Sequence, residues 1–237
     1  MTFYLIGLGL NKRSLTLEAL GVLKMCKKIY IEEYTAEFPY LIDELQEIIG
    51  KRVIPLTRTM VEMENFVKEG KHDDIALLVY GSPLTATTHI SLILKCRKEK
   101  IDYKIFENAS IFDAISETGL QIYKFGKTAS MPKWKDNYKP DSFLDIVRDN
   151  LKIKAHTLIL IDIGLSYQEA LRQFREACKN KIKLEKIVVC SRLGIEESKI
   201  FYDTLDELAG REVHVPFCFI IPSRLHFLEE EFLNNLQ

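Results

Sequence analysis

Short apolar runs rich in β-branched residues alternate with longer helical segments, and this alternation limits the possible folds more than any other feature of the chain. Residues 158–161 are apolar at every position, which is typical of a central strand buried on both faces. Strands separated by helices join as βα units and build a mostly parallel sheet, so the sequence predicts an α/β fold. In the N-terminal half the expected strands are residues 3–7, 28–32, 52–55, 75–79 and 103–107, and the expected helices are residues 15–24, 39–49, 60–69 and 87–98.

A second series of elements follows residues 108–110, which we interpret as a hinge. Because the second series is organised differently from the first, we predict two α/β domains, residues 1–108 and 109–237, with mostly parallel or mixed sheets. A cleft between two domains is a common place for a ligand, so we expect a cofactor cleft between them. The expected strands are residues 128–131, 157–163, 186–190 and 217–221, and the expected helices are residues 111–117, 142–152, 167–180 and 196–209.

The overall charge is close to neutral, which limits the kinds of partner. The chain has 33 basic and 34 acidic side chains and a net charge of -1. This balance argues against broad electrostatic attachment to nucleic acid or to an acidic membrane. No apolar segment reaches the roughly 18 residues that a membrane helix needs, and the glycine-interrupted residues 1–10 indicate a first strand instead of a signal peptide. We therefore predict a cytoplasmic protein with no direct nucleic-acid partner and no membrane partner.

The cysteines and histidines do not have the spacing of metal ligands. The five cysteines lie far apart and mostly among apolar neighbours, so we expect buried, reduced thiols. His156, His214 and His226 are not spaced with other ligand types as a metal site would require. We therefore predict no metal.

Two glycines follow the first expected strand, in Gly7-Leu8-Gly9. Small residues there let a ligand approach the backbone closely, although an ordinary tight turn would use them equally well. Glu32 ends the next strand, where a Rossmann domain keeps the acid that binds a ribose. A Rossmann-type NAD-dependent oxidoreductase is therefore one alternative, but the third glycine of its fingerprint is missing.

The turn Gly81-Ser82-Pro83 follows the most apolar strand of the N-terminal half, and a helix then begins whose first turn carries His89. We expect Thr85 or Thr87 to cap this helix. Open α/β sheets bind ligands at the carboxyl ends of their strands, so the turn is a candidate ligand contact. The alternatives are a well-capped strand–helix junction for the turn and a structural hydrogen bond for His89.

Residues 109–126 (A-S-I-F-D-A-I-S-E-T-G-L-Q-I-Y-K-F-G) are rich in polar, aromatic and glycine residues. Ser110 is a candidate N-cap for the helix that it precedes. Gln121, Tyr123 and Lys124 bring an amide, a phenol and an ammonium group together, as expected of the wall of a site. The alternative is a loop with solvated side chains.

Arg192 in S-R-L-G and Arg224 in P-S-R-L-H each follow an apolar strand. A guanidinium group at such a position suits a substrate carboxylate, which it can bind bidentately. The sequence contains no G-x-S-x-G, H-E-x-x-H or Walker pattern. This absence agrees with a reaction that needs positioning and exclusion of water but no covalent catalyst, such as methyl transfer from a sulfonium.

Three of these segments together resemble the diphthine synthase family, whose members are methyltransferases built like the tetrapyrrole methylases. They are G-L-G-L at residues 7–10, G-S-P-L-T-A-T-T-H at residues 81–89, and residues 109–126, and the resemblance runs from Phe3 to about His226. It implies a tetrapyrrole methylase-like fold, S-adenosylmethionine as the cofactor and, usually, a homodimer. It also implies methylation of the amino group of a 3-amino-3-carboxypropyl arm on a histidine of translation elongation factor 2, which gives diphthine in diphthamide biosynthesis.

The resemblance further implies a set of cofactor contacts that act mostly through backbone groups or apolar packing. These residues are Leu10, Ser82, Thr85, Ser110, Ile111, Ile161, Leu193 and Phe217. Ser82 departs from the family, whose members usually have Asp there, and a hydroxyl offers a cationic ligand only a neutral hydrogen bond. The last position can be aligned with Phe217 or with His214.

For the reaction itself we predict two groups of residues. Lys124, Arg192 and Arg224 are expected to hold the carboxylate of the acceptor, and His89 and Tyr123 are expected to relay the proton of its amine. Solvent is the alternative destination of that proton. Two further alternatives are a non-catalytic protein-binding relative of the methyltransferase fold and a methyltransferase that acts on tetrapyrroles or other small molecules.

Overall fold

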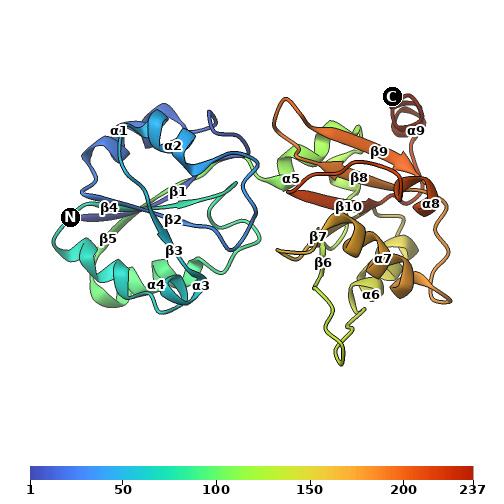
Figure 1. Ribbon diagram of the computed structural model, residues 1–237, viewed down its shortest axis with the longest axis horizontal. Coiled ribbons are helices and arrows are strands. Elements are labelled where there is room, and N and C mark those ends of the chain that lie inside the picture. The colour runs from blue at the N-terminus through green and yellow to red at the C-terminus, as the bar shows by residue number, and fades with distance from the viewer. Residues whose placement is uncertain (237) are drawn as a thin grey trace. The chain divides into compact units, whose positions relative to one another are not determined.

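The computed structural model describes residues 1–236, and its contacts divide the chain into two compact units, Met1–Asp113 and Ala114–Gln237. Each unit is built around one five-stranded sheet (Figure 1). The predicted α/β class with mostly parallel or mixed sheets is confirmed. The predicted domain boundary after residue 108 stays a prediction.

The sheet of the first unit is entirely parallel, with strand order β3-β2-β4-β1-β5. Because all five strands run in the same direction, their carboxyl ends meet at one edge of the sheet. The strands are β1 (Thr2–Gly7), β2 (Lys28–Glu32), β3 (Ile54–Leu56), β4 (Ile75–Val79) and β5 (Asp102–Phe106); the helices are α1 (Leu17–Met25), α2 (Ile42–Ile49), α3 (Arg58–Glu62) and α4 (Ile90–Glu99), with a 3-10 helix at Asn65–Lys71.

Neighbouring residues of the central strands enter two separate hydrophobic cores, because successive side chains of a strand point to opposite faces of the sheet. Leu5 belongs to the core that contains Leu92 of α4, and Ile6 belongs to the core that contains Leu23 of α1 and Leu45 of α2. All five residues of β4 are buried, because this central strand is covered on both faces. The packed sheet thus holds the loops at its carboxyl edge in place.

The sheet of the second unit is mixed, with strand order β6-β7-β10-β8-β9. β6 and β7 are parallel, and the other neighbouring pairs are antiparallel. The strands are β6 (Ala129–Met131), β7 (Thr157–Ile161), β8 (Ile187–Ser191), β9 (Lys199–Asp203) and β10 (Phe217–Ile221); the remaining helices are α5 (Ile111–Ala114), α6 (Phe143–Lys152), α7 (Tyr167–Cys178), α8 (Leu205–Leu208) and α9 (Phe227–Asn234), with 3-10 helices at Ile115–Thr118 and Ile122–Lys124.

The predicted helix at residues 196–209 is wrong. Lys199–Asp203 instead forms the edge strand β9, in which Phe201 pairs with Val189 of β8. The run I-F-Y consists of β-branched and aromatic residues, which favour a strand, and antiparallel pairing with β8 satisfies its backbone groups. Thr204 then caps the short helix α8 through a hydrogen bond from the Glu207 N–H, so only one turn of the expected helix forms.

Two other expected helices are divided. Residues 60–69 split into the end of α3 and a 3-10 helix, with Glu64 between them at a φ of 57°. Residues 111–117 split into α5 and a second 3-10 helix. A left-handed residue such as Glu64 ends an α-helix, which explains the first division.

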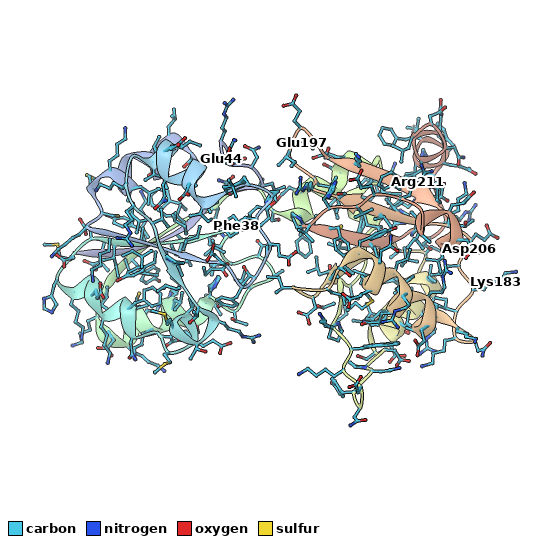
Figure 2. The ribbon with its side chains drawn as sticks, in the orientation of Figure 1. Phe38, Glu44, Lys183, Glu197, Asp206 and Arg211 are labelled. Carbon is cyan, nitrogen blue, oxygen red and sulfur yellow. The ribbon has the colours of Figure 1, made fainter. Side chains whose placement is uncertain are left out.

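The side chains of charged residues such as Glu44, Lys183, Asp206 and Arg211 lie on the outside of the two units (Figure 2). All five cysteines are free and buried, as predicted. Within residues 1–236, every helix is too short or too polar to span a membrane.

Candidate functional site

In the first unit the predicted site residues gather at the carboxyl ends of three neighbouring strands, β4, β1 and β5. The Gly9 N–H donates to the Gly81 carbonyl (3.1 Å), and the Gly81 N–H donates to the Gly9 carbonyl (3.0 Å). A Cβ atom on Gly7 would lie 2.6 Å from the Gly81 oxygen. The two glycine-containing loops therefore form one joined structure that side chains would separate.

Asn108 fastens the loops that follow β1 and β5 to each other. Its amide nitrogen donates to the carbonyls of Gly7 (3.1 Å) and Ser14 (2.9 Å), and its Oδ1 accepts a hydrogen bond from the Ala109 N–H (2.8 Å). The Tyr80 hydroxyl donates to the Leu10 carbonyl (3.0 Å), which fixes the loop from the side of β4. These contacts hold Leu10, a predicted cofactor contact, in a buried position.

Ser82 lies beside a carboxylate that the sequence did not identify. Its side chain is buried, and its hydroxyl donates to Oε2 of Glu107 at 2.6 Å. The Thr85 hydroxyl in turn donates to Ser82 Oγ (3.0 Å). The carboxylate group expected in the family at position 82 is thus absent, but an acidic side chain at the end of β5 lies directly against this position.

The backbone of Gly81, after the end of β4, lies next to Ala109 and Ser110, which follow β5. Gly81 has a φ of +73°, and a Cβ atom there would approach nothing closer than the Ala109 oxygen and the Ser110 Cα, both at 3.8 Å. Ser110 Oγ accepts a hydrogen bond from the Phe112 N–H (3.2 Å), which agrees with its expected role as an N-cap. Ile111, half-buried, begins α5 directly after it.

The expected caps of α4 are wrong, and His89 has a structural position. The helix begins at Ile90 with His89 as the N-cap, whereas the Thr87 hydroxyl donates to the Pro83 carbonyl (2.8 Å). His89 is buried, with Nδ1 3.1 Å from the Pro83 carbonyl and Nε2 3.3 Å from the Tyr34 hydroxyl. A carbonyl only accepts, so Nδ1 carries the proton and Nε2 accepts from Tyr34. Both ring nitrogens are therefore engaged inside the protein.

The Rossmann alternative is not supported by this geometry. The Gly9 N–H that would face a pyrophosphate is bonded to Gly81, and α1 begins only at Leu17, capped by Thr16. Glu32 is 1% exposed and accepts hydrogen bonds from the backbone N–H of Tyr34 and Thr35, both at 3.0 Å. This carboxylate closes its own turn and is not available to a ribose.

In the second unit, one buried carboxylate joins the segment around Lys124 to the segment around Arg224. Glu229 of α9 is fully buried and accepts hydrogen bonds from the backbone N–H of Gln121 (2.9 Å) and His226 (2.7 Å). It also forms an ion pair with Lys124, whose ammonium group donates to the Arg224 carbonyl (3.0 Å) as well. An ammonium group has three N–H donors, so these two contacts leave one for a ligand.

His156 completes the surroundings of Glu229. Its Nδ1 accepts from the Ser223 N–H (2.9 Å), so the proton is on Nε2, which donates to Glu229 Oε1 (3.2 Å). Burial lowers the pKa of His156 despite the opposing effect of the carboxylate, which keeps the ring neutral. Burial alone would raise the pKa of Glu229, but the hydrogen bonds from His226, Lys124 and the other donors outweigh it and lower the pKa to about 2.

Three predicted site residues of the second unit lie at the edge of its sheet opposite to the hydrogen bonds around Glu229. Ile161 ends β7, Phe217 begins β10, and Leu193 follows β8, and these positions share one edge because β10 is antiparallel to both neighbours. Leu193 is buried, and the Phe217 ring lies 5.7 Å from the Tyr167 ring. This edge is mainly apolar.

Arg192 belongs to the same edge and is positioned by the backbone. It has a φ of +53°, its N–H donates to the Pro216 carbonyl (2.8 Å), and its Nε donates to the Val215 carbonyl (2.9 Å). Among residues 1–236 the other two guanidinium nitrogens have no hydrogen-bond partner, so the guanidinium is held at Nε and can still donate to a ligand.

The structure does not bring Lys124, Arg192 and Arg224 together. His156, which contacts the Lys124 carbonyl, precedes β7, whereas Arg192 lies beyond the other end of the same strands. A five-residue strand rises about 3.3 Å per residue, so the two edges are roughly 15 Å apart. The structure therefore places Lys124 and Arg224 at one edge and Arg192 at the other, and the predicted role of the three residues in holding the acceptor carboxylate stays a prediction. Tyr123 lies with Lys124 and is 82% exposed.

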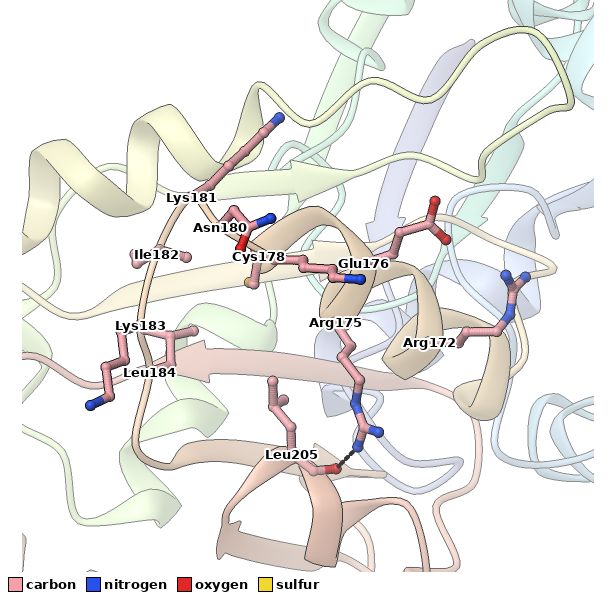
Figure 3. Close-up of a pocket in the computed structure, with 11 residues that line it drawn as sticks. Arg172, Arg175, Glu176, Cys178, Asn180, Lys181, Ile182, Lys183, Leu184 and Leu205 are labelled. Atoms are coloured by element: carbon pink, nitrogen blue, oxygen red, sulfur yellow. Dashed lines mark hydrogen bonds between the residues drawn. The ribbon is translucent and has the colours of Figure 1, made fainter.

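A shallow hollow of about 1090 Å³ lies elsewhere on the second unit, at the C-terminal end of α7 (Figure 3). Five of its eleven lining residues are basic, and one of them, Arg175, donates to the Leu205 carbonyl (2.6 Å). No residue of the predicted site lines it, so it is not part of the candidate site.

The sequence missed four residues that organise these two regions: Glu107, Asn108, His156 and Glu229. Glu229 had a detectable signal, because it stands three residues after His226 at the start of an apolar helix, the spacing of a capping box. Glu107 and Asn108 had only their place at the end of a strand. Among residues 1–236, no group of three or more His, Cys, Asp or Glu side chains could hold a metal ion.

Comparison with known proteins agrees with this architecture. Residues 2–209 match the family described as Tetrapyrrole (Corrin/Porphyrin) Methylases. The chain therefore belongs to the tetrapyrrole methylase family. Within it, the chain is 36% identical to a diphthine methyl ester synthase of Schizosaccharomyces pombe (98% of this chain, 93% of the relative) and 36% identical to a diphthine synthase of Methanocaldococcus jannaschii (98% and 97%). A crystal structure of diphthine synthase superposes with a TM-score of 0.91 at 28% identity, covering 100% of this chain and 96% of that one. These relatives place the chain in the diphthine synthase branch of the family.

Proposed function

We propose that this protein is an S-adenosylmethionine-dependent methyltransferase that acts in diphthamide biosynthesis. Its acceptor is the amino group of the 3-amino-3-carboxypropyl arm on a histidine of translation elongation factor 2, and its product is diphthine. The observation that carries the proposal is the similarity over nearly the whole chain to proteins named diphthine synthase and diphthine methyl ester synthase. The Rossmann-type oxidoreductase is not an equal candidate. The Gly9 N–H is already bonded to the Gly81 carbonyl, and the Glu32 carboxylate already accepts hydrogen bonds from the backbone of its own turn.

The residues present fit the cofactor chemically. Gly81 has no side chain, so a ligand can approach its backbone beside Ser110. In the first unit, Leu10 and Ile111 are apolar groups of the kind that suit an adenosine, which is mostly recognised by packing and a few placed polar groups. We propose as cofactor contacts the residues expected from the sequence, namely Leu10, Ser82, Thr85, Ser110, Ile111, Ile161, Leu193 and Phe217.

The chain's own part in the reaction is to bind, orient and exclude water. When bound, S-adenosylmethionine supplies a methyl group on a positively charged sulfur, and holding it in line with an amine accounts for a large share of the rate. Tyr123 is exposed and His89 has both ring nitrogens engaged, so we propose that solvent takes the amine proton before transfer. Arg192 is the cation that we propose for the acceptor carboxylate, because it shares a sheet edge with Leu193 and Phe217.

Lys124 and Arg224 then have a different role in this proposal. Glu229 fixes both segments next to α9, where large apolar side chains are exposed. These are Ile122 (43%), Tyr123 (82%), Phe227 (67%), Leu228 (55%) and Phe232 (45%). Exposed aromatic and aliphatic groups beside basic ones are typical of a protein interface. We propose that this surface serves either the homodimer or contact with elongation factor 2. Light scattering on a Phe227→Glu variant measures its oligomeric mass and separates the two, because only a dimer interface would change that mass.

Calorimetry and a methylation assay test the proposed function. The purified protein is titrated with S-adenosylmethionine, S-adenosylhomocysteine and NAD, and saturable binding of the first two without NAD is expected. Elongation factor 2 carrying the 3-amino-3-carboxypropyl arm is then incubated with protein and cofactor, and the added methyl groups are counted by mass spectrometry. The unmodified factor is the control. Binding of NAD alone, or cofactor binding without methylation of the modified factor, would contradict the proposal.

A further inference from the structure

We infer that Glu107 is a cofactor-binding residue, and that its carboxylate accepts the ammonium group of the cofactor's amino-acid arm. The inference rests on the proposed function, because it concerns how that cofactor is held. It starts from the hydrogen-bond chain at the carboxyl edge of the first sheet, in which Thr85 donates to Ser82 and Ser82 donates to Glu107. Both hydroxyl protons point toward the carboxylate, so the chain ends on a negative charge.

Ser82 is committed to this arrangement. It is 6% exposed, its proton goes to Glu107 Oε2 at 2.6 Å, and one of its lone pairs accepts from Thr85 at 3.0 Å. A buried hydroxyl that already donates one hydrogen bond and accepts another has little capacity left to bind a ligand. The group at this edge that can still bind a ligand strongly is the Glu107 carboxylate, which Ser82 orients.

Glu107 has an exposed side chain with one oxygen free. Within residues 1–236, its Oε1 accepts no hydrogen bond, and no Lys, Arg or His side chain forms an ion pair with it. The other acids nearby are used locally: Glu32 closes its own turn, and Asp113 accepts from the Ser110 N–H at 2.7 Å. Glu107 therefore keeps one carboxylate oxygen for a ligand, whereas the Glu32 carboxylate and the Asp113 carboxylate are engaged by neighbouring backbone groups.

The cofactor supplies a positive partner of the right kind. S-adenosylmethionine has two cationic groups, a sulfonium that cannot donate a hydrogen bond and an ammonium group that can donate three. Charge-assisted hydrogen bonds between an ammonium and a carboxylate are about twice as strong as neutral ones. A carboxylate whose second oxygen is already fixed by Ser82 binds such a donor with little loss of side-chain freedom.

A ligand pair and a set of variants test the inference. S-adenosylhomocysteine contains the ammonium group, whereas 5′-methylthioadenosine keeps the adenosine and sulfur and lacks the amino-acid arm. Calorimetry with Glu107→Gln should show affinity for S-adenosylhomocysteine reduced by at least about tenfold, the loss expected for a hydrogen bond between charged groups. Its affinity for 5′-methylthioadenosine should change less than about threefold. Glu47→Gln, an exposed glutamate on α2, is the matched control and should change neither.

Ser82→Asp provides a second, independent readout. It puts two carboxylates within hydrogen-bonding distance, and like charges at that distance do not both ionise freely, so affinity for S-adenosylhomocysteine should fall. Adding Glu107→Gln should restore it to within about threefold of the wild type, because the amide can donate to the new carboxylate. Thermal denaturation of each variant without ligand confirms that the fold is kept.

The outcomes separate this inference from the proposed function. If the wild-type protein binds neither adenosyl ligand, both are overturned. If it binds S-adenosylhomocysteine and Glu107→Gln leaves that affinity unchanged, or weakens both ligands equally, the inference fails and the proposed function stands. If Ser82→Asp raises affinity while Glu107 is intact, the carboxylate that binds the cofactor belongs at position 82, and the inference fails as well.

Discussion

Replacing Glu229 by glutamine should destabilise the second unit by about 3 kcal/mol. Four donors converge on the two oxygens of this fully buried carboxylate: the N–H groups of Gln121 and His226, the Lys124 ammonium and the His156 ring. A glutamine side chain keeps one acceptor oxygen and turns an NH₂ group toward two of these donors. Two hydrogen bonds are lost and Lys124 loses its counter-charge, and each buried unsatisfied group costs roughly 1–3 kcal/mol.

The pKa of Glu229 gives an independent figure for the same perturbation. The hydrogen bonds lower it from 4.5 to about 2 against the effect of burial. A depression of this size corresponds to roughly 3 kcal/mol of stability, which is present above pH 4.5 and is lost as the pH falls through about 2. For a unit of this size, 3 kcal/mol lowers the midpoint of thermal unfolding by about 10 °C.

Fluorescence of the one tryptophan of the chain makes the measurement specific to the second unit. Trp134 packs against the core of that unit, and its Nε1 donates to the Pro140 carbonyl (2.9 Å), so its emission reports unfolding of the unit that holds Glu229. Glu231→Gln, an exposed position on the same helix, is the matched control. A Glu229→Gln midpoint within about 2 °C of the control would refute the argument that the buried carboxylate holds the two segments.

Three further predictions follow from the contacts. Burial lowers the pKa of His156 from 6.5, so the stability that its neutral ring contributes is complete above pH 6.5 and declines as the pH falls from there. The midpoint of thermal unfolding, followed by Trp134 fluorescence, should therefore decline less between pH 7 and pH 5 in His156→Gln than in the wild type. Asn108→Ala removes the hydrogen bonds to Gly7, Ser14 and Ala109. It should lower the free energy of unfolding by about 2 kcal/mol, measured by urea unfolding with circular dichroism, and should weaken S-adenosylhomocysteine binding. An unchanged affinity would show that cofactor binding does not need these hydrogen bonds between the loops. Gly9→Ala places a Cβ atom 2.4 Å from that of Ser14 at a φ of +69°, so we expect a loss of more than about 2 kcal/mol, whereas Gly21→Ala, with nothing within 4 Å, should be neutral or stabilising.

The first unit was the easier half to predict from the sequence. Its sheet is parallel and its central strand β4 is buried and appears as an uninterrupted apolar run, and residues 28–32 and 75–79 were located without error. The error at residues 196–209 came from an edge strand whose identity depends on pairing with β8. No local property of Lys199–Asp203 reports that partner, since it is set by tertiary contacts.

For the candidate site, the sequence could predict only which residues lie at the ends of strands. Residues at strand ends, such as Leu10 and Ser82, could be placed because parallel strands bring their carboxyl ends together. The use of each side chain was not predictable. The Glu107 carboxylate lies 2.6 Å from the Ser82 hydroxyl, nearer than the Thr85 hydroxyl of the same loop at 3.0 Å, although 25 positions separate Glu107 from Ser82 in the sequence.

Lys124 and Arg192 show why charge alone did not assign a role. Both are cations that follow or precede apolar strands, and both looked suitable for an acceptor carboxylate. The antiparallel pairing of β10 with β7 and β8 sends the two to opposite edges of one sheet, and only the topology contains that information. At one edge the cation neutralises a buried carboxylate and organises a surface with exposed aromatic groups. At the other edge the Arg192 backbone donates to the Pro216 carbonyl and its guanidinium Nε donates to the Val215 carbonyl, beside apolar residues, and the remaining donors of the guanidinium keep the geometry that a carboxylate requires. Substituting Arg192 by lysine keeps the charge but loses that geometry, so the topology predicts a larger effect on acceptor methylation from Arg192→Lys than from Arg224→Lys.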